Sequence, residues 1–139
     1  MKEEEKKFQE KYMEMKELEE QMKHIQQQSN IVEQQLMELM SNVQCLDDLK
    51  KIKEGTEILV PVTSGVFAKA ALKENKKLLV NVGADTVISK DIDSTKKLME
   101  KQVGEMRELQ AKMMMQMQRL ALLASHTQEE LKELASKLE

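Results

Sequence analysis

The sequence predicts an α+β protein that is mainly α: a long antiparallel coiled-coil helical hairpin, with two β-hairpins between its helices. Charged residues make up 34% of the 139 residues and aromatic residues only 2%, which favours long helices with a thin apolar seam. Two Glu-, Lys-, Leu- and Met-rich segments flank a β-branched segment that holds the only proline. We therefore treat 1–139 as one domain, with helices over 1–54 and 91–139 and hairpins over 55–90.

Residues 2–54 are predicted to form one helix because apolar side chains recur at alternating intervals of three and four. This spacing is typical of a coiled coil and runs over more than five heptads. Gly55 is expected to cap the C-terminal end of the helix. The seam positions are Phe8, Lys11, Met15, Leu18, Met22, Ile25, Ser29, Val32, Leu36, Leu39, Val43 and Leu46.

Residues 91–138 predict a second helix, with Asp91 as its N-cap. One seam position repeats every seven residues, at Met99, Met106, Met113, Leu120, Thr127 and Leu134. The companion stripe is less regular, at Val103, Leu109, Met117, Leu123 and Leu131. Because the two helices match in length, we expect them to pair antiparallel, with Ser29 and Gln116 forming a polar layer in the seam.

The middle of the chain contains four short β-like runs, over 57–62, 66–72, 77–82 and 86–89, separated by turn residues. They predict two hairpins that are apolar on both faces, with Pro61 at an edge or a bulge. Isolated hairpins are marginal in water, so we expect several chains to combine theirs into a β-barrel hub. The assembly residues are expected to be Ile58, Val60, Val62, Phe67, Leu79, Val80, Val82 and Val87.

Composition and motifs argue against several classes of function. The small net charge of −3 does not indicate the basic surface expected of a nucleic-acid-binding protein. No segment has the ~20 apolar residues of a membrane span. The start of the chain lacks the apolar core of a signal peptide, and the lone Cys45 suits a reducing cytoplasm. No metal-ligand spacing, phosphate loop or nucleophile constellation is found, so we expect neither an enzyme nor a bound cofactor.

The stretches "LVPVTSG" and "VNVGA", the latter leading into the second helix, resemble the prefoldin family. The second hairpin favours its α class. The resemblance implies a cytoplasmic heterohexamer of two α and four β subunits, whose hairpins form a double β-barrel and whose helices project as arms. It also implies an ATP-independent chaperone that binds unfolded proteins near the distal ends of the arms and passes them to a group II chaperonin.

Candidate client-binding residues follow from that implication. At the arm tips they are Phe8, Tyr12, Met13, Met15, Leu131, Leu134 and Leu138. Phe8, Met15 and Leu134 can equally be ordinary seam residues of a fraying coiled coil, whereas Tyr12 and Met13 fall off the seam. Met114 and Met115 are also off the seam, and they suit either a client-facing surface or a contact with a neighbouring subunit. The alternative function is a structural coiled-coil protein that forms a filament through its β-hub.

Overall fold

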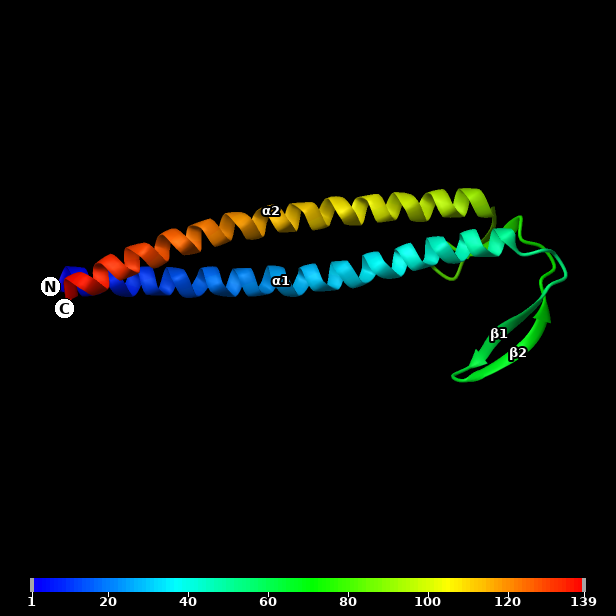
Figure 1. Cartoon of the computed structure of the whole chain (residues 1–139), viewed down its shortest axis with the longest axis horizontal. Coiled ribbons are helices and arrows are strands. Elements are labelled where there is room, and N and C mark those ends of the chain that lie inside the picture. Colours follow the sequence, from blue (N-terminus) through cyan, green and yellow to red (C-terminus); the bar gives the residue numbers. More distant parts are fainter. Residues whose placement is uncertain (1, 139) are drawn as a thin grey trace. The chain divides into compact units, whose positions relative to one another are not determined.

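The computed structural model describes residues 2–138 and contains two helices and four strands (Figure 1). Their order is α1 (Lys2–Lys51), β1 (Glu57–Thr63), β2 (Val66–Ala71), β3 (Lys77–Asn81), β4 (Val87–Asp91) and α2 (Ile92–Leu138). The predicted mainly-α class, with two hairpins between two long helices, is confirmed. The chain forms two compact units: a terminal unit, of the described residues up to Gln35 and from Met106 onward, and a central unit, Leu36–Glu105.

The seam of α1 lies where the spacing predicts it. All the predicted positions from Phe8 to Leu46 are buried or half-buried, and Ile25, Val32 and Leu36 are among the most buried residues of the chain. The residues that follow them, such as Gln26 and Glu33, are exposed. A strict three-four spacing keeps one stripe of a helix against its partner, which is why the apolar pattern alone locates this seam.

Two of the predicted seam positions of α2 are wrong. Gln110 and Ala124 lie in the seam, whereas Leu109 and Leu123 are 42% and 49% exposed. The seam keeps the three-four spacing without a break, and each leucine stands one residue, or about 100° of helix rotation, away from it. The seam positions are Met99, Val103, Met106, Gln110, Met113, Met117, Leu120, Ala124, Thr127, Leu131 and Leu134.

Ion pairs fix the antiparallel pairing within each unit. In the terminal unit Lys11 Nζ lies 2.9 Å from Glu130 Oε2, and the N-terminal part of α1 runs beside the C-terminal part of α2 (Figure 1). In the central unit Lys50 Nζ lies 2.8 Å from Asp93 Oδ1, and Lys96 pairs with Asp47. The expected layer of Ser29 and Gln116 is wrong, because Gln116 is exposed on the flank of α2, one residue before the seam residue Met117.

The C-terminal end of α1 differs from the prediction. The helix ends at Lys51, so Gly55 is not its cap, although Gly55 has the expected left-handed backbone with φ +86°. The side-chain amide of Asn75 provides the cap: its Nδ2 donates to the carbonyls of Leu49, Lys50 and Ile52 at 3.0, 3.2 and 2.7 Å. A loop more than twenty residues away in the sequence thus satisfies the carbonyls that a helix end leaves without partners.

The hairpins form two separate two-stranded antiparallel sheets, β1–β2 and β3–β4. Their register places Ile58 opposite Ala70 and Val80 opposite Ile88. The register of β1 shifts between Pro61 and Thr63, and this bulge beside the proline is the arrangement predicted for it. Asp91 precedes the first residue of α2, as predicted, and its carbonyl accepts a hydrogen bond of 2.9 Å from Thr95 Oγ1.

Candidate functional site

The predicted tip residues all belong to the terminal unit, where the paired helices bring them to the same end. The seam members Phe8, Met15, Leu131 and Leu134 are half-buried between the helices, as ordinary coiled-coil residues are. Leu138 lies on the seam spacing and is 40% exposed. The four half-buried side chains hold the two helices together, so their buried parts become available to a ligand only where the pair opens.

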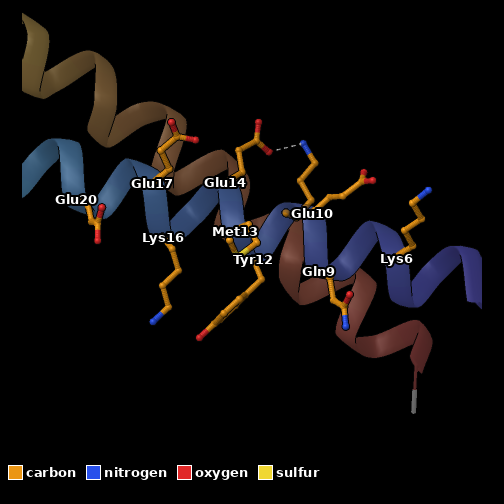
Figure 2. A pocket seen from close by; sticks show the side chains of 10 residues that line it. Lys6, Gln9, Glu10, Tyr12, Met13, Glu14, Lys16, Glu17 and Glu20 are labelled. Atoms are coloured by element: carbon orange, nitrogen blue, oxygen red, sulfur yellow. Dashed lines mark ion pairs between the residues drawn. The ribbon is translucent and has the colours of Figure 1, made fainter.

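Tyr12 and Met13 differ from the seam residues because they are exposed while the helices are paired. Tyr12 is 47% exposed and Met13 is 67% exposed. The Tyr12 ring stacks on Phe8, with centroids 6.5 Å apart and planes at 13°, and Lys16 Nζ stands 5.4 Å from the Tyr12 centroid. Figure 2 shows Tyr12 and Lys16 projecting from one side of α1 and Glu14 from another. The tip therefore offers an ordered aromatic surface with a cation beside it.

A charged bridge closes the helix pair at this end. The Glu130 carboxylate raises the pKa of Lys11, with Glu14 adding to the effect, and Lys11 in turn lowers the pKa of Glu130. Glu130 also accepts a contact of 2.8 Å from Nε2 of His126, which is an ion pair only when the imidazole is protonated. These groups are solvated, so the bridge makes a modest contribution that depends on pH and salt.

The hollow beside Tyr12 is open and is lined by α1 alone (Figure 2). Most of its lining is charged and points into solvent. Its residues are Lys6, Gln9, Glu10, Lys11, Tyr12, Met13, Glu14, Lys16, Glu17 and Glu20. Among residues 2–138 no group of three His, Cys, Asp or Glu side chains is placed to hold a metal ion. The tip is therefore a surface for contact, and it offers no enclosed space for a small substrate.

The predicted assembly residues lie on the two hairpins of the central unit. Ile58 and Val80 are half-buried, and the other six are exposed, with Leu79 reaching 79%. Leu59, Val66 and Ile88, which the prediction did not include, are exposed as well. Strand alternation explains them: each hairpin carries apolar side chains on both faces, so the residues between the predicted ones are apolar too.

Each hairpin also has two strand edges without a partner among the described residues, since each sheet has only two strands. Edges of this kind pair readily with strands from another chain. The hairpins therefore combine apolar faces with open edges that other strands can pair with.

A further exposed surface lies on α2 in the terminal unit. Met114 and Met115, singled out from the sequence as off-seam residues, are 62% and 63% exposed. Leu122 is more exposed than either and was not predicted, although it stands seven residues, about two helical turns, after Met115. Leu109 and Leu123 are exposed as well because the seam excludes them, and they lie on the opposite flank of the helix from Met114. No described helix carries an apolar stretch long enough to cross a membrane.

Comparisons with known proteins agree with this architecture. A family model described as "Prefoldin subunit" matches residues 18–137. The prefoldin subunit alpha of Thermofilum pendens is 31% identical over 74 residues, which are 53% of this chain and 57% of that protein. That of Methanococcus maripaludis strain C7 is 31% identical over 77 residues, 55% of this chain and 51% of that protein. The chain thus spans little more than half the length of these relatives.

Longer matches are more divergent. The prefoldin subunit alpha of Methanococcus aeolicus is 26% identical over 108 residues, 78% of this chain and 73% of that protein. A chain in the cryo-EM structure of filamentous PFD from Methanocaldococcus jannaschii has a TM-score of 0.73 and covers 83% of this chain and 95% of its own length. Its sequence identity of 17% makes it evidence for the fold alone.

Proposed function

The chain belongs to the prefoldin family, within its α class, and on this premise we propose that it is a subunit of an ATP-independent chaperone that holds unfolded proteins. It works in the cytoplasm as a hexamer of two α and four β-class subunits and delivers its clients to a group II chaperonin. Holding a non-native chain requires weak apolar contacts repeated on several arms, and no covalent chemistry, cofactor or nucleic acid.

The observation that carries this proposal is the exposure of Tyr12 and Met13 while the helices are paired. Neither residue occupies a seam position, and the stacking of Tyr12 on Phe8 accounts for only part of the exposed apolar surface that the two residues present. The half-buried Phe8 and Leu134 add contact area when the pair opens, because helix ends open at low cost. The surrounding Glu and Lys side chains keep the empty surface soluble.

The test compares two double variants in the complex reconstituted with β-class subunits. Tyr12→Gln with Met13→Gln removes the tip surface, whereas Ile31→Gln with Met37→Gln removes a matched pair of exposed apolar residues, 54% and 65% exposed, elsewhere on α1. The concentration needed to suppress half the aggregation of an unfolded client should rise about threefold or more for the tip variant and stay unchanged for the control. Equal suppression by both variants, in intact complexes, would contradict the proposal.

A second candidate function is a structural protein that forms filaments through its hairpins. The open strand edges and exposed apolar faces favour self-association when β-class subunits are absent. The structural neighbour with the same fold comes from a filamentous assembly. The mass of the purified chain, measured alone and with β-class subunits, separates the two functions: a closed hexamer supports the chaperone, and open-ended growth in both samples supports the filament.

A further inference from the structure

The outer face of α2 in the terminal unit combines exposed apolar side chains with an absence of acidic ones. Asp and Glu account for 25 of the 139 residues, yet none lies between Glu108 and Glu129. The same interval holds most of the large apolar side chains that α2 exposes. They are Leu109, Met114, Met115, Leu122 and Leu123.

Helix geometry gathers four of these residues, Leu109, Met115, Leu122 and Leu123, on one side of α2, whereas Met114 lies on the other flank of the seam at about 100° of rotation per residue. Met115 and Leu122 are seven residues apart and lie almost directly opposite the seam, about 10 Å from each other along the axis. Lys112 and Arg119 follow one side of this pair, and a shallow hollow is lined by Lys112, Met115, Gln116 and Arg119. On the other side stand the uncharged residues Ala111, Gln118 and Ser125. We call the surface formed by Leu109, Lys112, Met115, Arg119, Leu122 and Leu123 the α2 outer face.

The two cations of the α2 outer face have no acidic partner. Among the described residues neither Lys112 nor Arg119 forms an ion pair, and the absence of Asp and Glu on their helix turns explains why. Lys11, Lys50 and Lys96 pair with carboxylates, but other described lysines such as Lys6 and Lys23 do not. What distinguishes Lys112 and Arg119 is the exposed apolar side chains beside them. A ligand that brings its own carboxylates therefore finds two unpaired positive charges beside an apolar stripe.

We propose that the α2 outer face binds segments of non-native proteins in which apolar side chains are flanked by Asp or Glu. This inference rests on the holdase function proposed above and specifies part of its client class. Methionine is flexible and polarisable, so Met115 fits side chains of differing shape. Lys112 and Arg119 supply the charge complementarity, which attracts acidic flanks and disfavours basic ones.

The size of the face favours a transient ligand over a second copy of the chain. A stable interface buries about 800 Å² per partner with roughly 20–30 residues on each side. The α2 outer face offers four large apolar side chains along a single helix. Contacts of this extent are weak and reversible, which suits a chaperone that releases its clients without ATP.

The experiment uses the reconstituted complex and two fluorescent peptides with identical apolar residues, one flanked by Glu and one by Lys. The Glu peptide should bind about 2- to 10-fold more tightly at low salt, and the preference should shrink as salt screens the charges. Lys112→Glu with Arg119→Glu should reverse the preference. Lys97→Glu with Lys101→Glu, which changes the net charge equally elsewhere on α2, should leave it intact.

A second variant tests the apolar part without changing charge. Met115→Gln with Leu122→Gln should weaken the binding of both peptides, with helicity and complex mass unchanged. Equal affinity of the wild type for the two peptides, together with normal suppression of client aggregation, would overturn this inference and leave the holdase proposal standing. Absence of both peptide binding and suppression would overturn both. A change of complex mass in the charge-reversed variant, with peptide preference retained, would instead make the face a contact between subunits.

Discussion

Exchanging residues at positions 109 and 110 tests where the seam of α2 runs. Gln110 is a half-buried seam residue, and Leu109, one residue earlier, is 42% exposed. Burying a leucine fully stabilises by about 1.5–3 kcal/mol, so a leucine at the half-buried position should contribute about 1 kcal/mol. We expect Gln110→Leu to stabilise the terminal unit by about that amount, and Leu109→Gln to cost about 1 kcal/mol or less because Leu109 is already 42% exposed.

Urea unfolding followed by circular dichroism, together with hydrogen exchange of the amides around position 110, measures both effects. The reasoning would be refuted if Leu109→Gln cost about 2 kcal/mol or more while Gln110→Leu had no effect, because that is the result for a seam through Leu109. Position 124 gives a contrasting control. Ala124 is only 7% exposed, so Ala124→Leu should overpack the seam and destabilise by about 1–3 kcal/mol, whereas Leu123→Gln should be nearly neutral.

Four further predictions concern the cap, the ion pair, the hairpins and a turn. Asn75→Ala should destabilise by about 1–2 kcal/mol and speed hydrogen exchange in the last turn of α1, because the carbonyls at that end lose their donor; unchanged exchange would contradict the cap. Glu130 has a lowered pKa through Lys11, so its stabilisation is present above its ordinary value of 4.5 and is lost as the pH falls through the folded-state pKa. The raised pKa of Lys11 makes its share present below 10.5 and lost as the pH rises through its folded-state pKa, so spin labels flanking the pair should show a modest increase in the separated population at both extremes, and Glu130→Gln should remove the increase at acidic pH. Leu79→Asp should leave helicity intact and lower the mass of the assembled complex, since this side chain is 79% exposed in the single chain; a complex of normal mass would argue against a role in assembly. Ala84→Gly should raise the thermal midpoint, with a gain of about 1 kcal/mol, because Ala84 holds φ +50°, and a lower midpoint would show that the turn is not strained.

The sequence was sufficient for features that depend on local periodicity. The three-four spacing located every seam position of α1, and strand alternation with turn residues located both hairpins. The tip residues Tyr12 and Met13 were found to be off the seam by the same count, and both are exposed. In each case the position along the element determines the environment of the side chain, so no information from distant residues is needed.

The sequence was insufficient to predict two kinds of feature. One is a seam position occupied by a polar or small residue, and the other is a contact with a residue far away in the sequence. Leu109 and Leu123 were assigned to the seam because they are apolar. The three-four spacing, counted along the helix from the preceding seam residues, places Gln110 and Ala124 there instead. The cap of α1 was assigned to Gly55, the nearest suitable residue. Asn75 replaces it because the loop between the hairpins returns to the helix end, and local sequence does not report such a contact.

The two misassigned leucines also explain why the α2 outer face exists. A helix with a limited number of large apolar residues can place them in the seam, where they stabilise pairing, or outside it, where they bind a ligand. In α2 a polar Gln110 and a small Ala124 occupy seam positions, while Leu109, Leu123 and their neighbours remain outside. The two helices therefore pair more weakly in this region than they would if leucines occupied these seam positions. Gln110→Leu should accordingly stabilise the terminal unit without improving client binding, since it strengthens the seam and leaves the outer face unchanged.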